Sequence, residues 1–422
     1  MSGTVDRVFA ALCLGVGILA LSATLVAGAA AEVDDDTTDW EEVISRLTHE
    51  VRRMPRHAAT RKQLAVAHNN YAVSLAGQGE WQLATHHLEE AIRLDAQDGQ
   101  FRTNLASVHL SRAYEEYADH RFRQAHRALE DALDIDPELA AAYVLLGEIE
   151  YNTQRLPQAK AAWERALNLD PSLAEITRRL AQLNEELPVE SQFGRISRAY
   201  FDLRYEEGMD RPVGFDLQSV LLQARRLVGS DFAYWPNYTL VVLIYTGDSF
   251  RALRQETPEW LAGQYDGKIR VPLPNDELDL DTVKQILFHE YTHALVHDLT
   301  DGRCPTWFNE GLAEYEGARH GTPHLEQLAA AVSSEQLLPW EQLDLSFSKG
   351  RPVEEIALGY QQSHSIVRYL VEHYGFWRVR QVLKAVKAGT PLARVLESEF
   401  HITRSRLESN WRAWLPRFLS RH

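Results

Sequence analysis

The chain contains one motif twice, as Ala132-Leu133-Asp134-Ile135-Asp136-Pro137 and, 34 residues later, as Ala166-Leu167-Asn168-Leu169-Asp170-Pro171. A related stretch, Ala91-Ile92-Arg93-Leu94-Asp95, ends 41 residues before Asp136. The surrounding region, from about residue 60 to 186, is rich in Ala, Leu, Arg and Glu and has few glycines. Small residues at fixed positions allow paired helices to approach closely. The pattern therefore predicts an all-α repeat array of stacked helical hairpins.

This region resembles tetratricopeptide repeats in its 34-residue period and its closing Asp-Pro. The resemblance implies a helical domain over residues 40–187 that binds a substrate or a protein partner. The longer interval between Asp95 and Asp136 predicts one to two additional helical turns in the middle repeat, since one turn takes 3.6 residues. We expect the histidines of this region to be surface or packing residues rather than metal ligands: His68, His86, His87, His109 and His126.

The first 31 residues are typical of an export signal, because Arg7 precedes an apolar run over residues 8–26 and small residues follow it. We expect the mature chain to begin near Glu32 and to be periplasmic or secreted. The apolar run is also close to the roughly 20 residues that span a bilayer, so an uncleaved membrane anchor is the alternative. Cys13 lies within this run, which leaves Cys304 without a partner for an internal disulfide.

A second domain is predicted over residues 193–422, because Leu187-Pro188 interrupts the helical pattern and aromatic and β-branched residues follow. Residues Tyr238–Tyr245 predict a buried strand, and Lys268–Val271 predict a short edge strand, since Pro272 is tolerated at an edge. Helical patterns return after that. The expected fold of this domain is α+β with a small sheet. The formal net charge of -16 argues against a nucleic-acid partner, which needs a basic surface.

The clearest chemical signal is His289-Glu290-Tyr291-Thr292-His293. Residues four apart share one face of a helix, so both imidazoles can point at a single metal ion. Glu290 is offset by one residue and can reach a water beside the metal without ligating it. The surrounding apolar residues predict a buried helix that Asp279 or Asp281 caps. The alternative is a pair of core histidines that satisfy each other.

A zinc peptidase needs a third protein ligand. Val296 and Leu299 stand where a metzincin requires Gly and His, and His297 would lie about 12 Å along the helix from His289. The following stretch, Trp307-Phe308-Asn309-Glu310-Gly311-Leu312-Ala313-Glu314-Tyr315, resembles the gluzincins, the thermolysin-like group of peptidase-MA-like domains with a zincin-like fold. The resemblance covers roughly residues 193–420, and its specific part covers 286–316.

The gluzincin resemblance implies one zinc ion, held by His289, His293 and Glu310, with Glu290 as the catalytic base. It also implies that Glu314 orients a ligating histidine. Zinc would then lower the pKa of its water, Glu290 would accept the proton, and a peptide bond would be hydrolysed. Gly311 would let the two helices approach each other.

Gluzincins commonly take a further donor to the oxyanion from a downstream helix. Tyr360, expected near a helix start, matches that position better than His364, which lies one turn further on the same face. The segment from Trp260 to Pro272 resembles the edge strand along which such peptidases bind an extended peptide substrate. Two other functions remain: an inactive zinc-binding module and an exported assembly or scaffold protein that acts through its repeats. Glu290 argues against both, because a structural zinc site does not need it.

Overall fold

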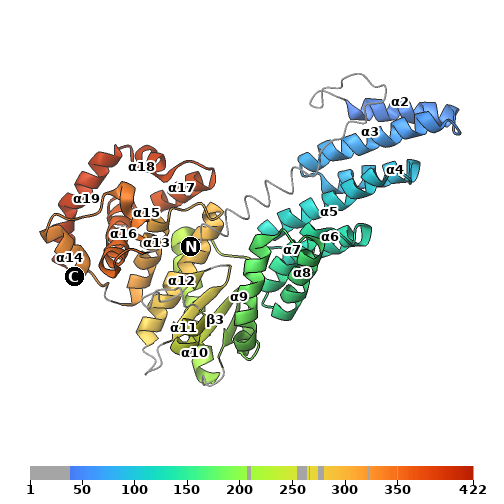
Figure 1. Ribbon diagram of the computed structural model, residues 1–422. Helices are drawn as coiled ribbons and strands as arrows, with labels where there is room; N and C mark the ends of the chain where they lie inside the picture. Colours follow the sequence, from blue (N-terminus) through green and yellow to red (C-terminus); the bar gives the residue numbers. More distant parts are fainter. Residues whose placement is uncertain are drawn as a thin grey trace. The chain divides into compact units, whose positions relative to one another are not determined.

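The computed structural model describes residues 39–421 except 207–210, 254–263, 266, 274–279, 322 and 349. The expected signal or anchor, residues 1–31, lies outside the described residues. Among the helices that are described, none combines the length and the apolar character needed to cross a membrane. The chain divides into two compact units between Leu187 and Pro188 (Figure 1).

The N-terminal unit is an array of helices joined by short turns: α2 (Trp40–Arg53), α3 (Ala58–Gly77), α4 (Trp81–Leu94), α5 (Gly99–Ala118), α6 (Phe122–Ile135), α7 (Ala140–Asn152), α8 (Leu156–Leu169) and α9 (Ala174–Glu190), whose last three residues belong to the C-terminal unit. The alanines of the repeated motif are fully buried at equivalent positions of α4, α6 and α8: Ala84, Ala91, Ala125, Ala132, Ala159 and Ala166. The expected helical array is therefore present, and small residues do lie at its helix crossings.

The closing aspartates of the motif end their helices in the same way. Asp95, Asp136 and Asp170 each accept a hydrogen bond on the side chain from the backbone N–H two residues later, at 3.3, 3.0 and 2.9 Å. This turn replaces the next helical hydrogen bond and redirects the chain. The aspartate thus recurs because each hairpin needs the same turn.

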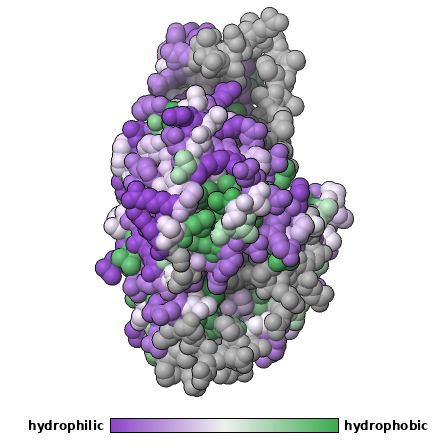
Figure 2. All heavy atoms as spheres, turned by 90° about the vertical axis from the view of Figure 1, so that its left-hand side faces the viewer, coloured by the Kyte–Doolittle hydropathy of each residue, from purple (hydrophilic) through white to green (hydrophobic). Residues whose placement is uncertain are grey.

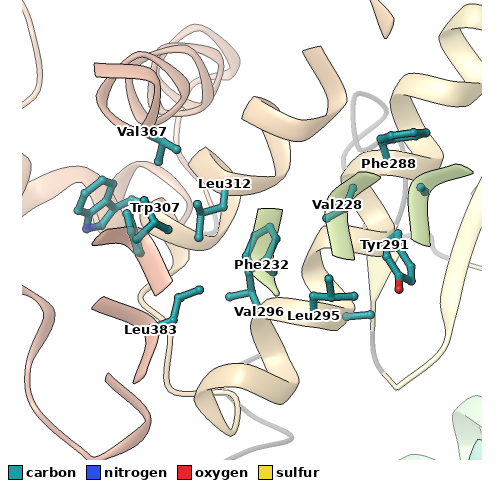
Figure 3. Close-up of a cluster of buried hydrophobic side chains, with 14 of the residues drawn as sticks. Val228, Phe232, Phe288, Tyr291, Leu295, Val296, Trp307, Leu312, Val367 and Leu383 are labelled. Carbon is teal, nitrogen blue, oxygen red and sulfur yellow. The ribbon is translucent and has the colours of Figure 1, made fainter. Parts of the chain in front are cut away.

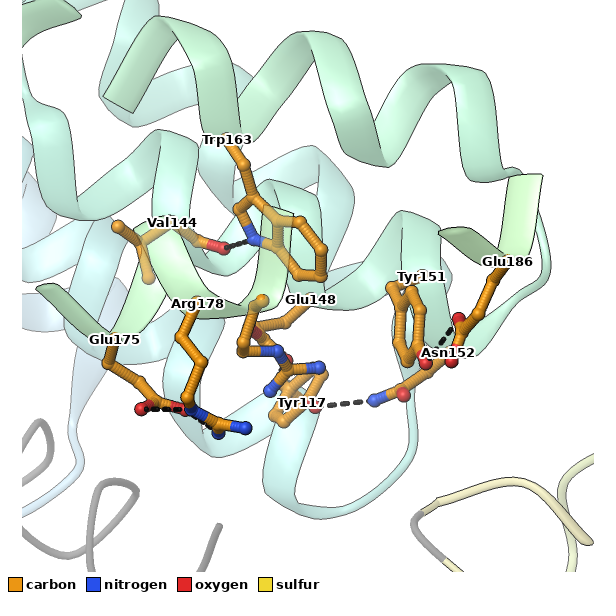
Figure 4. Close-up of polar contacts among 10 residues, drawn as sticks. Tyr117, Val144, Glu148, Tyr151, Asn152, Trp163, Glu175, Arg178 and Glu186 are labelled. Carbon is orange, nitrogen blue, oxygen red and sulfur yellow. Dashed lines mark hydrogen bonds and ion pairs between the residues drawn. The ribbon is translucent and has the colours of Figure 1, made fainter. Parts of the chain in front are cut away.

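Successive hairpins are also joined by side-chain bonds between residues 35 apart. Asn104 donates to Asn69 at 2.7 Å, Asn152 to Tyr117 at 2.6 Å, and Tyr151 to Glu186 at 2.8 Å. Figure 4 shows the last two, with Trp163 donating to the carbonyl of Val144. These bonds fix the register of one hairpin on the next.

The additional turns of the middle repeat lie in α5. This helix has 20 residues, whereas α7 has 13. The difference of seven residues is about two turns.

The prediction that Leu187-Pro188 ends the helical pattern is wrong by one turn, because α9 continues to Glu190 with Pro188 inside it. Proline removes a single backbone donor, and in a last turn this loss is small. The end of α9 is also held by its side chains. The Glu190 carboxylate is buried and accepts hydrogen bonds from Arg270 at 2.6 Å and Tyr245 at 2.5 Å.

The C-terminal unit is built on a five-stranded sheet with the order β1-β2-β3-β5-β4. Its strands are β1 (Gly194–Arg198), β2 (Phe201–Tyr205), β3 (Leu240–Thr246), β4 (Gln264–Tyr265) and β5 (Ile269–Leu273). β2, β3 and β5 run parallel, while β1 and β4 are antiparallel to their neighbours. The buried strand expected at residues 238–245 is β3, which is central in the sheet.

The expected edge position of Lys268–Val271 is wrong. β5 lies between β3 and β4, and the edge on that side is the two-residue strand β4. A strand of two residues has too little alternation to be recognised from sequence.

Helices α10 (Arg211–Phe232) and α12 (Leu280–Thr300) pack with one face of the sheet in a single hydrophobic core, while the short helix α11 (Gly247–Leu253) follows β3. Figure 3 shows Phe288, Tyr291, Leu295 and Val296 of α12 in one cluster with side chains of α10 and of later helices. The helix is buried around most of its circumference, as its sequence predicts. This burial fixes the directions in which its polar residues point.

The remaining helices complete the C-terminal unit: α13 (Thr306–Gly317), α14 (Glu326–Ser333), α15 (Leu343–Ser346), α16 (Val353–Tyr374), α17 (Phe376–Lys387), α18 (Leu392–Phe400) and α19 (Arg404–Leu419), with single 3₁₀ turns at Ala318–His320 and Trp340–Gln342. Figure 2 looks onto the side on which α14 and α19 lie and shows apolar side chains gathered in a hollow with hydrophilic ones around it. The α+β prediction for this unit thus agrees with its small sheet and its many later helices.

Candidate metal centre

The two histidines of the motif lie on α12, one turn apart. Leu287, Phe288, Ala294 and Leu295 of this helix are fully buried, so the motif is held against the core. Asp281 is not the cap, because α12 begins at Leu280 and Asp281 bonds Lys284 within the first turn at 2.8 Å. Asp279 lies outside the described residues.

Three side-chain atoms converge at the surface of α12. His289 Nε2 and His293 Nε2 are 3.0 Å apart, and Glu310 Oε2 of α13 lies 3.4 Å from each of them. Zinc binds nitrogen and oxygen at about 2.0–2.1 Å, so a tetrahedral site holds its ligand atoms about 3.3 Å apart. The three atoms therefore fit one face of such a tetrahedron.

The other nitrogen of each imidazole has a partner of its own. His289 Nδ1 lies 3.3 Å from Glu314 Oε1, and His293 Nδ1 lies 3.0 Å from Asn309 Oδ1. An imidazole that donates from Nδ1 keeps a lone pair on Nε2, which is the form that binds a metal. Two lone pairs and a carboxylate oxygen then face one point, and a cation there relieves their repulsion.

Asn309 is the residue of this site that the sequence did not reveal. It precedes Glu310 on α13, and an amide at that position is no signal by itself. Its contact with His293 depends on how α13 lies across α12, which only the structure gives. Glu314 lies where the gluzincin resemblance implied, beside His289.

Glu290 is buried, with 2% of its surface exposed, and its Oε2 atom has no hydrogen-bond partner among the described residues. The ligand atoms of His289, Glu290 and His293 lie within 4.8 Å of one another, so distance alone would allow Glu290 as the third ligand. Glu310 is the better ligand because it contacts both Nε2 atoms at 3.4 Å, whereas Glu290 forms no ion pair with either ring. Glu290 thus stands beside the metal position rather than in it.

The electrostatics of the site favour positive charge. Burial by itself lowers the pKa of His289, but its contacts with Glu310 and Glu314 outweigh burial and raise it well above the usual value. Burial raises the pKa of Glu310, yet His293 and His289 hold it well below its usual range. Carboxylates that stay ionised beside paired imidazoles attract protons or a metal cation.

Glu290 has the opposite tendency. Burial raises its pKa, and the imidazoles of His293 and His289 oppose that rise. A carboxylate with a raised pKa is a stronger base than an exposed glutamate.

Helix α13 is placed by contacts at both of its ends. Asp344 Oδ1 accepts the backbone N–H of Trp307 at 2.9 Å and so caps the first turn, one turn before Glu310. At the other end, a Cβ on Gly317 would meet the carbonyl oxygen of Gln285 of α12 at 3.1 Å. Gly317 therefore marks the close approach of α13 to α12.

The role expected for Gly311 needs correction, because its open side faces α16 and not α12. A Cβ at this position would meet the carbonyl oxygen of Ser363 at 2.6 Å and Val367 at 2.9 Å. Gly311 thus brings α16 close to the helix that carries Glu310.

That close approach places Tyr360 and His364 of α16 near the site. Tyr360 is in the third turn of α16 rather than at its start, and its ring packs edge-on against Phe347 at 5.0 Å. Burial and the nearby carboxylates of Glu310, Glu314 and Glu290 raise its pKa well above the usual value. His364 is buried near Glu314 and against Phe418, with ring centroids 6.3 Å apart. Both residues are therefore within electrostatic reach of the carboxylates of the site.

Part of the C-terminal unit is similar to a known protein family. Residues 262–417 match the family model described as the Peptidase MA superfamily. No curated protein matches the chain. A solved structure titled "MamA RS-1 ArsTM double mutant" is 19% identical over 44% of this chain and 84% of its own length, with a TM-score of 0.22, and this likeness is too slight to use. The C-terminal unit is therefore similar to the Peptidase MA superfamily over residues 262–417.

Proposed function

We propose that the protein is an exported zinc-dependent peptidase. The observation that carries this proposal is the convergence of His289 Nε2, His293 Nε2 and Glu310 Oε2 with mutual separations of 3.0 to 3.4 Å. The match of residues 262–417 to the Peptidase MA superfamily supports it independently. Export rests on the sequence of residues 1–31 alone.

His289, His293 and Glu310 would hold one zinc ion, with Glu314 and Asn309 fixing the orientation of the two imidazoles. Zinc, when bound, polarises a substrate carbonyl and lowers the pKa of a nearby water. Glu290 would accept a proton from the attacking water and return it to the leaving amine. Its burial excludes bulk water and keeps its free oxygen available for that proton.

Tyr360 is the first candidate for the donor that stabilises the developing oxyanion, because its phenol is held neutral beside three carboxylates. His364 is the second candidate. In this proposal the N-terminal array binds a substrate or a partner protein, and the peptide substrate lies along the sheet edge near β4 and β5.

The test uses the chain without residues 1–31. Zinc content by elemental analysis and casein cleavage would be measured with and without a chelator. We expect one zinc per chain, cleavage that the chelator abolishes, and recovery on adding zinc.

Two variants sharpen this test. Glu290→Gln should keep its zinc and lose at least a thousandfold in cleavage rate, because it removes only the base. His324→Asn changes an exposed histidine just before α14 and should keep both zinc and activity. A chain that binds zinc stoichiometrically but cleaves no substrate would instead be a zinc-binding module, and a chain that binds no zinc would refute the metal centre itself.

A further inference from the structure

Six residues of β1, the β1–β2 turn and α10 form a basic and aromatic patch, which we call the α10 patch: Arg198, Tyr200, Phe215, Leu222, Arg225 and Arg226. Its large apolar side chains are exposed, with 43% of Tyr200, 38% of Phe215 and 42% of Leu222 accessible to solvent. The candidate metal ligands lie on other helices, α12 and α13. The α10 patch is therefore a separate feature of the same unit.

The arginines of the patch lie over its aromatic rings. The guanidinium carbon of Arg225 is 3.7 Å from the centroid of the Tyr200 ring, and that of Arg198 is 5.0 Å from the Phe215 ring. Stacking occupies the flat face of a guanidinium and leaves its N–H edge able to bind a carboxylate. The exposed Arg198 is thereby held ready for an anionic group, whereas Arg225, whose Nε atom is buried, mainly holds the Tyr200 ring in place.

The helical spacing places the remaining members on one face of α10. Phe215 and Leu222 are seven residues apart, which is two turns, and Arg226 follows Leu222 by one turn. This face therefore carries two exposed apolar side chains with Ser219 between them, Arg226 at one end and the stacked Arg198 at the other.

The charge of the α10 patch is unusual for this chain. Arg198, Arg225 and Arg226 form no ion pair with any described carboxylate, although the chain has a net charge of -16. Within the described part of the chain, Arg225 donates only to the carbonyl of Pro236, at 3.1 Å. By contrast, Asp202 pairs with both Arg195 and Arg204 at the neighbouring strands. Asp216, the acidic neighbour of Phe215, points about 100° around the helix from it.

We propose that the α10 patch is a docking surface for an acidic protein segment that carries at least one large apolar side chain. Arginine and aromatic residues dominate the binding energy of protein interfaces, and unpaired arginines next to exposed rings supply both components. A lipid surface fits less well, because arginines lie over the faces of Tyr200 and Phe215 and the acidic chain as a whole is repelled by an anionic bilayer. This inference does not depend on the peptidase proposal.

The experiment uses an array of twelve-residue peptides with graded numbers of Asp and Glu and of Leu and Phe, followed by fluorescence anisotropy on the best binders. We expect saturable binding that needs both carboxylates and an apolar residue and that weakens as salt is raised. Replacing Asp and Glu by Asn and Gln in the same peptide should weaken binding at least tenfold. We expect the same loss of binding in the double variant Arg198→Glu with Arg226→Glu. We also expect it, separately, in the double variant Phe215→Ser with Leu222→Ser.

Trp377 and Arg378 provide a matched control on the same unit. Trp377 is 49% exposed and Arg378 lies over its ring at 4.2 Å, but Arg378 is already paired with Glu399 at 3.7 Å. Trp377→Ser with Arg378→Glu should leave peptide binding unchanged, and the far-UV circular dichroism spectrum and thermal unfolding midpoint report on folding in every variant. Three outcomes would each overturn the proposal. The first is that no peptide of the array shows binding that depends on the patch, and the second is that the control variant loses binding equally. The third is binding only to vesicles with 30 mol% phosphatidylglycerol.

Discussion

At the scale of single residues, the proposed metal centre depends on the side chains that hold the two imidazole rings in position. Asn309 and Glu314 each contact the Nδ1 atom of one imidazole, at 3.0 and 3.3 Å. We expect Asn309→Ala and Glu314→Ala each to weaken zinc binding about 10- to 100-fold, because the ring loses the partner that fixes its tautomer and orientation. Competition with a fluorescent chelator measures this change.

The control for these variants is Glu326→Gln, in the exposed first turn of α14, which should leave zinc affinity unchanged. If Asn309→Ala bound zinc as tightly as the wild type, the contact with His293 would have no part in holding the metal.

Gly311 gives a second prediction at this scale. A methyl group here would meet the Ser363 carbonyl oxygen at 2.6 Å, a backbone atom that cannot rotate away. We expect Gly311→Ala to lower the free energy of unfolding by about 1–3 kcal/mol, as overpacking does. Gly77→Ala is the matched control, because nothing lies within 4 Å of its added Cβ and alanine favours helix. Urea unfolding measures the free energy of unfolding of both variants. If Gly311→Ala and Gly77→Ala were equally stable, α13 and α16 could separate without cost.

The part of the site that lies within one helix could be predicted from the sequence, whereas the contacts between helices could not. His289 and His293 share one helix, so their spacing alone predicts that they meet. Glu310 needed a family resemblance, because no spacing rule relates α13 to α12. Asn309 and the side that Gly311 faces depend on the rotation of α13 against two neighbours, which the sequence does not encode locally.

At the scale of elements, the helical array was predictable because its signal is repeated. The buried alanines and the closing aspartates recur with the period of the hairpin, so each repeat supports the interpretation of the others. The end of α9 was not predictable, because it depends on Glu190 meeting Arg270, 80 residues away. The edge of the sheet was missed for a similar reason, since β4 has only two residues.

The pair His68 and His87 makes the first hairpin sensitive to pH. Their Nδ1 atoms lie 2.8 Å apart between α3 and α4, a distance at which one ring must be a neutral acceptor. Burial, and then the neighbouring His87, lower the pKa of His68 to about 4. The unfolded chain, with an ordinary histidine pKa near 6.5, therefore binds more protons between pH 4 and 6.5.

The neutral pair thus makes its full contribution to the free energy of unfolding above pH 6.5, and this contribution is lost as the pH falls toward 4. We expect the N-terminal unit to lose roughly 1–2 kcal/mol between pH 7 and pH 5. In His68→Gln this loss should largely disappear. Thermal unfolding at both pH values measures the difference, and an identical pH dependence in the variant would mean that the pair does not titrate on unfolding.

At the scale of the whole molecule, each unit has apolar clusters of its own. In the C-terminal unit one large cluster joins the sheet, α10, α12 and the later helices. The helical array is held by several smaller clusters between neighbouring hairpins. Because stabilisation is carried within each unit, a ligand of one unit need not stabilise the other.

This separation predicts how removal of the metal affects unfolding. Zinc bound by α12 and α13 should stabilise only the C-terminal unit, by about 4 kcal/mol when its concentration is a thousandfold above the Kd. For a unit of this size that corresponds to a shift in Tm on the order of 10 °C. Differential scanning calorimetry of the chain without residues 1–31 should show two transitions, and a chelator should lower the temperature of only one of them.

In His293→Ala, the temperature of that transition should equal the chelated value with or without zinc, while His68→Gln should affect only the other transition. If the chelator lowered both transitions equally, the two units would unfold as one, and if it lowered neither, the metal centre on α12 and α13 would contribute nothing to the fold.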